Sequence, residues 1–168
     1  GDIGIVFVAT VPDPTLENSS PQFGPYPNNG YFCINTLNEF TFEATDVDGD
    51  SLAYFLDNPI FGSLATIADP NPVGGGPKPY NLCNWAATYS LDNAVGGDPV
   101  MSVDPVTGLI TSSPENAGVY AFAILVEEWR DGELIGVIRR EISLQATNCN
   151  EDIAPDFVDF EIFDTVYF

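Results

Sequence analysis

The strongest candidate for chemistry in this sequence is a short acidic turn, Asp46-Val47-Asp48-Gly49-Asp50. Alternate carboxylates around a glycine can bring several oxygens to one hard cation, and oxygen ligands are what Ca²⁺ requires. The turn is not an EF-hand, because that loop needs glycine at its sixth position and glutamate at its twelfth, where this chain has Ser51 and Asp57. The alternative is a metal-free turn, since aspartate and glycine favour turns in any case.

The sequence offers few candidate residues for catalysis. The chain has no histidine, which removes Ser-His-Asp and Cys-His catalysis and every histidine-ligated metal site. Paired carboxylates act in glycosidases, but Glu127 and Glu128 are adjacent on an expected strand and point to opposite faces. The sequence also lacks a Gly-x-Ser-x-Gly motif and a phosphate-binding loop. We therefore expect no enzyme activity.

The charge of the chain limits its partners. Twenty-five acids against four bases give a formal charge of −21. This excludes binding to a nucleic-acid backbone, which needs a basic face, and favours cations as ligands. No apolar run approaches the ~20 residues of a membrane span, so we expect no membrane insertion. Low lysine content with a large acidic excess is typical of an extracellular protein at the cell surface.

The three cysteines are Cys33, Cys83 and Cys149. They form no Cys-x-x-Cys pair, so the sequence does not indicate a zinc site. In an oxidising compartment, one disulfide and one buried free thiol would account for the odd number. Connectivity cannot be derived from sequence alone. Because Cys33 and Cys149 flank the compact region, we expect the disulfide between these two.

Strand signals dominate the chain. Apolar or alternating runs predict strands over residues 3–11, 39–45, 52–56, 99–103, 108–111, 119–129 and 134–146. The segment 59–79 is rich in proline and glycine and is expected to be a long surface loop. No segment has a convincing helical period. The sequence therefore predicts an all-β fold.

The last two expected strands are joined by Asp131-Gly132, a strong hairpin signal. The expected opposite pairs are Leu125–Ile138, Trp129–Leu134 and Glu127–Gly136. If residues 39–45 and 52–56 are strands B and C of an immunoglobulin-like antiparallel sandwich, and the last two are F and G, the B–C and F–G loops share one end. We therefore predict a calcium site formed by Asp46, Asp48, Asp50, Glu127 and Asp131, since close carboxylates without a cation repel one another.

An internal echo suggests how the chain is organised. Pro21-Gln22-Phe23 before Tyr31-Phe32 is matched by Pro155-Asp156-Phe157 before Tyr167-Phe168. We predict that residues 1–17 are the last strand of a preceding repeat or an N-terminal arm, 18–150 are one sandwich repeat, and 151–168 are the first strand of the next repeat or a C-terminal arm. The alternative is one domain with apolar arms. The arm residues are Ile5, Phe7, Phe157, Phe160 and Phe163. Since the chain begins at Gly1, we expect a fragment or a processed product.

Three further features have a functional and a structural interpretation. Trp85 and Trp129, with seven tyrosines, could form a sugar-stacking platform, although such residues more often fill a sandwich core. Arg140 falls on the expected core side of its strand and is interpreted as an internal ion-pair partner. Asn18-Ser19-Ser20 has the form of an N-glycosylation sequon, a pattern too short to carry weight.

Several motifs resemble those of cadherin-like repeats. Residues 44–52, Ala-Thr-Asp-Val-Asp-Gly-Asp-Ser-Leu, resemble the opening A-T-D-x-D-G-D-x-L of these repeats, and residues 103–110 resemble their D-x-x-T-G-x-I/L hairpin. Ala117-Gly118-Val119-Tyr120 is similar to their A-G-x-Y. Over residues 18–149 the order of motifs resembles repeats of giant surface proteins in Bacteroidota, of the gliding-motility adhesin and type IX-secreted kinds. There Tyr31-Phe32-Cys33, residues 127–132 and Asn148-Cys149 recur in this order.

The resemblance implies a non-catalytic cell-surface β-sandwich strung in tandem, with a structural or adhesive role. Calcium would carry over to Asp46, Asp48 and Asp50, and less surely to Glu127. The resemblance also implies O-glycans, which proteins of this group bear on Asp-Ser/Thr-apolar triplets. Ser51 and Thr165 are therefore candidates for O-glycosylation. Cys83 has no place in the family pattern, and the cadherin Asp-Arg-Glu motif is absent. The inter-domain three-calcium arrangement of cadherins is therefore not implied.

Two functions follow as hypotheses. The leading one is an extracellular structural or adhesive repeat that builds a long surface fibre, with neighbouring copies or repeats as partners, and with apolar arms that complete or continue into neighbouring sandwiches. The alternative is a carbohydrate-binding module of a larger secreted protein, in which the 59–79 loop and nearby aromatic residues hold a surface glycan.

Overall fold

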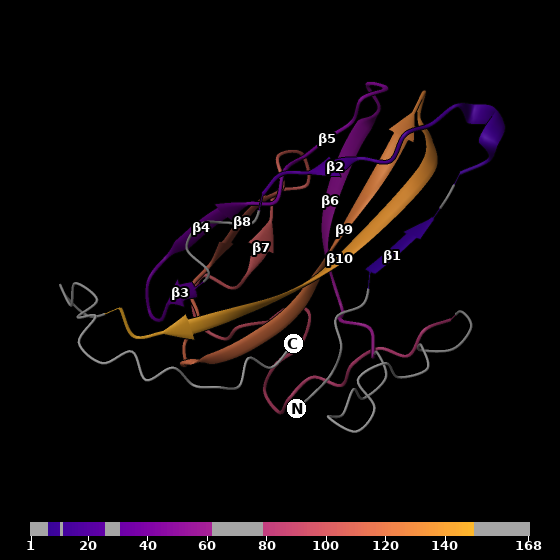
Figure 1. Ribbon diagram of the computed structural model, residues 1–168. Helices are drawn as coiled ribbons and strands as arrows, with labels where there is room; N and C mark the ends of the chain where they lie inside the picture. Colours follow the sequence, from indigo (N-terminus) through magenta and orange to yellow (C-terminus); the bar gives the residue numbers. More distant parts are fainter. Residues whose placement is uncertain (1–6, 11, 26–30, 62–78, 150–168) are drawn as a thin grey trace, which may run out of the picture.

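The computed structural model describes residues 7–10, 12–25, 31–61 and 79–149 (Figure 1). Its elements are β1 (Phe7–Thr10), the 3-10 helix η1 (Pro14–Leu16), β2 (Gln22–Phe23), β3 (Tyr31–Cys33), β4 (Asn38–Thr41), β5 (Ala44–Thr45), β6 (Ser51–Asp57), β7 (Ser102–Val103), β8 (Leu109–Ser112), β9 (Gly118–Arg130) and β10 (Glu133–Thr147). The all-β prediction is confirmed over these ranges. None of the helical structure they contain is long and apolar enough to cross a membrane.

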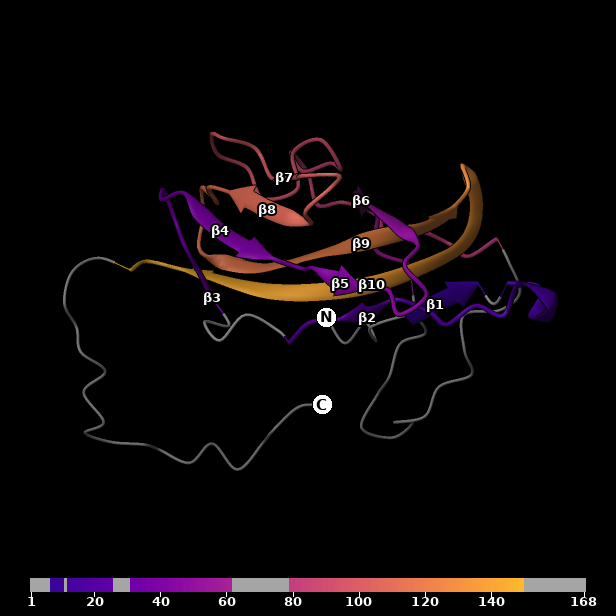
Figure 2. The ribbon, with the colours of Figure 1, turned by 90° about the horizontal axis from the view of Figure 1, so that it is seen from above.

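The strands form one large sheet and two smaller ones. The large sheet has the order β1-β10-β9-β6, and β3 also pairs with β10. A three-stranded sheet has the order β4-β8-β7, and β2 pairs with β5. All pairs are antiparallel except β3 with β10. Figure 2 shows β4, β7 and β8 on one side of the layer that contains β9 and β10.

The long β9–β10 hairpin forms because its turn residues accept left-handed backbone angles. Asp131 and Gly132 have φ values of 52° and 82°, as a two-residue hairpin turn with the twist of its strands requires. Trp129 pairs with Leu134, as the sequence predicts. The pairing continues along both strands to Gly118 and Ala146.

The other two expected pairs of this hairpin are wrong by one residue. The register shifts between Leu134 and Gly136, which is a β-bulge. Beyond the bulge, Leu125 lies opposite Arg139 and Glu127 lies opposite Val137. Because of this one-residue shift, the residue of β9 that lies opposite Gly136 is Glu128 and not Glu127.

One hydrophobic core joins the sheets. Alternation along β9 buries one side-chain face, while the three-stranded sheet supplies buried residues from β4 and β8. The buried members of this core include Phe40, Ile110, Tyr54, Phe122, Ile124 and Ile142. Arg140, which was expected to lie on the core side, has its guanidinium over the rings of Phe23 and Phe42, at 5.2 Å and 5.9 Å from their centroids. Such contacts are cation–π interactions.

The expected strands are present, with changed limits. The predicted strand over 39–45 is divided into β4 and β5, because the chain pairs with β8 up to Thr41 and then with β2 from Ala44. The strand expected over 99–103 is reduced to β7. The short strands β2 and β3 were not predicted. Over 3–11, the structure describes a strand from Phe7 to Thr10 that pairs with β10.

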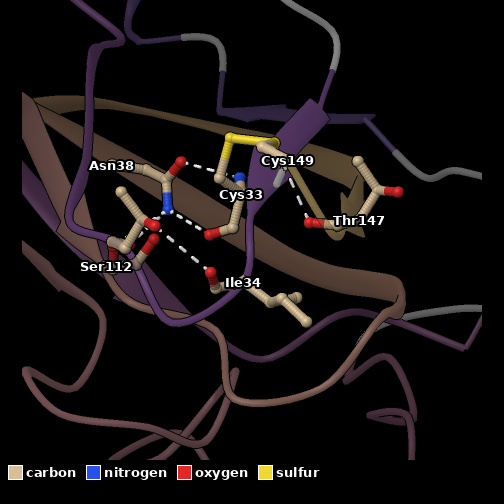
Figure 3. Close-up of a disulfide and its surroundings, with 7 residues drawn as sticks. Cys33, Ile34, Asn38, Ser112, Thr147 and Cys149 are labelled. Atoms are coloured by element: carbon tan, nitrogen blue, oxygen red, sulfur yellow. Dashed lines mark hydrogen bonds between the residues drawn. A yellow bond between two sulfur atoms is a disulfide. The ribbon is translucent and has the colours of Figure 1, made fainter. Parts of the chain in front are cut away.

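The predicted disulfide between Cys33 and Cys149 is confirmed. It joins β3 to the segment after β10, where β3 and β10 run in parallel (Figure 3). Asn38 supports the same corner: its Oδ1 accepts from the Cys33 N–H at 2.9 Å and its Nδ2 donates to the Cys33 carbonyl at 2.9 Å. Cys83 is the free cysteine, and it is half-buried where a buried thiol was expected. Because structural disulfides form in oxidising compartments, this bond indicates such a location.

We predict that replacing both Cys33 and Cys149 by serine lowers the free energy of unfolding by about 2–5 kcal/mol. The reason is that the two cysteines are 116 residues apart, so the disulfide restricts much of the unfolded chain. Urea denaturation measures the change. Cys83→Ser, which removes only the free thiol, is the matched control. An equal loss in the control would contradict the assignment of the stabilisation to the disulfide.

Candidate metal site at the acidic turn

The acidic turn between β5 and β6 is organised by its first aspartate. Asp46 Oδ1 accepts hydrogen bonds from the backbone N–H groups of Asp48 at 2.9 Å and Asp50 at 3.1 Å. Gly49 has a φ of 85°, a conformation that glycine adopts at little cost. The Asp-x-Asp-Gly-Asp sequence therefore closes a compact loop in which alternate side chains lie on one side.

Three carboxylates converge at this turn. One carboxylate oxygen from each of Asp46, Asp48 and Asp50 lies within 4.8 Å of the other two. Asp48 is exposed, while Asp46 and Asp50 are half-buried. Asp46 Oδ2 is buried and has no hydrogen-bond partner. An all-oxygen set with a buried, unpaired acceptor could bind a metal ion, and its chemistry suits a hard cation.

Arg130 at the end of β9 already supplies positive charge to this group. Its Nε and Nη2 each donate to a different oxygen of Asp50, both at 2.6 Å. These hydrogen bonds hold the pKa of Asp50 below its usual value, and Asp50 raises the pKa of Arg130. Because the Asp50 pKa is lowered on folding, the pair stabilises the fold at neutral pH and loses this effect as the pH falls through the lowered pKa.

Glu128 is a fourth carboxylate beside the turn. Its side chain is buried, on the same face of β9 as Val126, and its Oε1 accepts from Asn18 Nδ2 at 2.8 Å. Burial raises the pKa of Glu128, and the neighbouring carboxylates of Asp46 and Asp50 raise it further. The ionised form of Glu128 is therefore less favourable in the folded chain than in the unfolded chain, so Glu128 costs stability as the pH rises from the usual glutamate pKa toward its raised pKa. A nearby cation would reverse this effect.

Glu127 was expected at this site, but the acid of β9 that lies beside the turn is Glu128. Glu127 lies on the other face of β9, where its Oε2 accepts from Trp129 Nε1 at 3.0 Å. Asp131 is exposed in the hairpin turn. Neither belongs to the converging group that the described residues form. The alternation of Tyr120, Phe122, Ile124 and Val126 is the sequence signal that could have identified Glu128 as the inward-facing acid.

The remaining predicted residues are placed as follows. Ser51, the glycosylation candidate, is exposed at the start of β6. Phe7 is 65% exposed and pairs with Arg140 in the β1–β10 ladder. The other arm residues and the second glycosylation candidate, namely Ile5, Phe157, Phe160, Phe163 and Thr165, lie outside the described residues.

The comparisons with known proteins give no match. No family model, no curated protein and no solved structure is similar to this chain. The function proposed below is therefore argued from the residues of this chain and their geometry.

We predict that Glu128→Gln raises the melting temperature in EDTA at pH 7. The substitution keeps the acceptor for Asn18 but removes a buried negative charge next to Asp46 and Asp50. Differential scanning calorimetry measures the shift. Glu127→Gln is the matched control, because it changes the adjacent residue on the other face of the strand. A lower melting temperature for Glu128→Gln alone would show that the charge is already compensated.

Proposed function

We propose that this chain is a non-catalytic extracellular repeat that builds a cell-surface fibre, and that calcium at the acidic turn stiffens its junction with the preceding unit. The observation that carries the proposal is a set of hydrogen bonds that join the segment that follows β1 to Asp48 of the acidic turn and to Glu128 and Arg130 beside it. The absence of histidine from the sequence supports a non-catalytic role. The disulfide supports an oxidising, extracellular location.

The fold that we propose is an immunoglobulin-like sandwich of the cadherin-like kind. In such a sandwich, strands B, E and D share one sheet and strands C, F and G share the other. If β4 with β5 is strand B, then β6 to β10 become C, D, E, F and G in order. The observed sheets β4-β8-β7 and β6-β9-β10 then have the orders B-E-D and C-F-G. The single core between the sheets is consistent with this assignment.

The junction is supported by four hydrogen bonds. Arg130 Nη1 donates to the Leu16 carbonyl at 2.8 Å and its Nη2 to Asn18 Oδ1 at 2.7 Å. Asn18 Nδ2 donates to Glu128, and the Ser19 N–H donates to Asp48 Oδ2 at 2.6 Å. The segment that leads from β1 into the sheets is therefore bonded to one of the converging acids, Asp48, and to the neighbouring Glu128 and Arg130. A cation bound there would fix the direction in which the chain enters the domain.

Calcium is the cation that fits this donor set best. It takes six to eight oxygen ligands in a flexible arrangement, including carboxylates, carbonyls and water. Asp46 Oδ2 is unpaired, and Asp48 is exposed with one oxygen, Oδ2, bonded to the Ser19 N–H, so each could offer an oxygen to an ion. Both oxygens of Asp50 are bonded to Arg130, so we assign Asp50 a supporting role unless the guanidinium moves. Glu128 replaces Glu127 as the fourth candidate ligand.

We predict that Ca²⁺ raises the melting temperature relative to EDTA, because a ligand that binds only the folded state stabilises it. At a free concentration one hundred times Kd, this stabilisation is about 2.7 kcal/mol. Asp48→Asn is expected to remove most of the Ca²⁺ effect. Asp131→Asn, which tolerates the left-handed turn conformation, is the control and should keep it. Equal melting temperatures in Ca²⁺ and EDTA would show that these acids form a turn that binds no Ca²⁺.

Assembly into a fibre is the second part of the proposal. Strand addition joins backbone edges with little dependence on side chains, and a heterologous contact that does not close on itself continues as a filament. The β10 edge accepts a strand of this kind, because β1 pairs there over Val137 to Arg140 while remaining mostly exposed. An equivalent strand from a neighbouring copy could make the same backbone pairing.

We predict that the full chain forms fibres that negative-stain electron microscopy can image, and that deletion of residues 157–168 abolishes them. The deleted segment carries Phe157, Phe160 and Phe163, which are the apolar residues that we assign to the contact. A variant with Phe160→Glu and Phe163→Glu keeps the chain length and should behave like the deletion. Fibres of unchanged form from both variants would overturn the role of this arm. Discrete particles from the full chain would overturn the fibre itself.

A further inference from the structure

We propose that a pocket beside the first residues of β9 binds a neutral sugar ring. It is a site distinct from the acidic turn, and the inference does not depend on calcium binding or on fibre formation. Counting along β9 from Tyr120 to Trp129 at the rise of a strand, the two sites are about 30 Å apart.

The pocket exists because β6 is shorter than β9. The β6–β9 ladder ends at the pair Asp57–Ala123, whereas β9 begins at Gly118. Over the first residues of β9, the described strands therefore pair with it on the β10 side only. A cavity of about 290 Å³ lies at this gap, at the lower limit of typical small-ligand sites. Its size fits a single ring better than a folded partner.

Aromatic side chains form one part of the pocket wall, and they are held in place. Trp85, Tyr89 and Tyr120 line the cavity. Trp85 Nε1 donates to Asn58 Oδ1 at 2.7 Å, and the Tyr120 hydroxyl donates to the Asn116 carbonyl at 2.8 Å. The rings of Tyr89 and Tyr120 meet edge to face, with centroids 5.7 Å apart. Rings fixed in this way offer a rigid apolar surface at little entropic cost.

Polar groups line the rest of the cavity. Asn84, Glu141 and Ser143 supply an amide, a carboxylate and a hydroxyl. A sugar ring has apolar C–H faces and hydroxyl groups around its edge, so it matches a wall that combines aromatic rings with hydrogen-bonding groups. A purely apolar ligand would use only the aromatic part of this wall.

Charge favours a neutral ligand over an ion. The Glu141 carboxylate already accepts from Arg139 Nη1 at 2.9 Å, and it also accepts from the Ile60 N–H. Arg139 therefore compensates the charge of the one acid that lines the cavity, which weakens its attraction for a cation. An anion is disfavoured by Glu141 itself and by the net charge of −21. A neutral polyol meets neither difficulty.

Saturation-transfer difference NMR on the full chain tests this proposal. The probes are D-glucose, D-galactose, D-mannose and N-acetyl-D-glucosamine, with choline as a cationic comparison. We expect saturable transfer to at least one sugar, with a Kd of about 1 mM, as a ligand of this size allows. Ser143→Tyr adds bulk at an exposed position of the pocket wall and should abolish the transfer. Gln145→Tyr, two residues further on the same face of β10, is the control and should retain it.

Each other outcome overturns the proposal. Absence of saturable transfer to all four sugars would show that the pocket is not a sugar site. Transfer to choline alone would assign the aromatic wall to a cation. Sugar transfer that persists in Ser143→Tyr would place the binding elsewhere. Trp85→Ala gives a second check of the location, with the β-sheet circular dichroism spectrum as its measure of folding.

Discussion

The ladder between β9 and β10 is the constraint on which the other parts of the structure depend. At one end, its tight turn brings Arg130 and Glu128 to the acidic loop. At the other end, β10 continues far enough to pair with β3 and to reach the disulfide. The bulge before Gly136 sets the register. A Cβ on Gly136 would lie 2.2 Å from Glu128 Oε2, so the glycine leaves the space that the buried carboxylate occupies.

The shortage of basic residues makes each arginine important to the fold. Arg130 joins Asp50 to the segment after η1, and Arg139 bridges Asp57 and Glu141. Arg140 lies over two aromatic rings. With twenty-five acids and four bases, the chain cannot pair most of its carboxylates internally. Acids that converge, as at the turn, must then repel one another, take up a proton or bind a cation from solution.

The sequence predicted the parts of the fold that depend on local signals. The Asp131-Gly132 turn, the long alternating strands around it and the cysteines that flank the compact region all lie where they were expected. The register beyond the turn was missed, because a bulge adds one residue without a clear signal in Ile135 or its neighbours. The choice of acid was missed for a different reason: the inward face of β9 is the one that carries Tyr120, Phe122, Ile124 and Val126, and alternation places Glu128 and not Glu127 on that face. The pocket could not be predicted, since it depends on where β6 ends relative to β9.

The acidic turn combines two requirements that oppose each other. Folding favours a compact loop in which Asp46 caps two N–H groups and Arg130 neutralises Asp50. Binding a divalent ion favours leaving carboxylates uncompensated, as for Asp46 Oδ2 and Glu128. Because one arginine balances only one of these acids, the loop can fold without metal and still retain negative charge for an ion. Asp48 and Glu128 also accept hydrogen bonds from the entering chain, so an ion bound at this loop, as we propose, would be coupled to the rigidity of the junction through these two side chains.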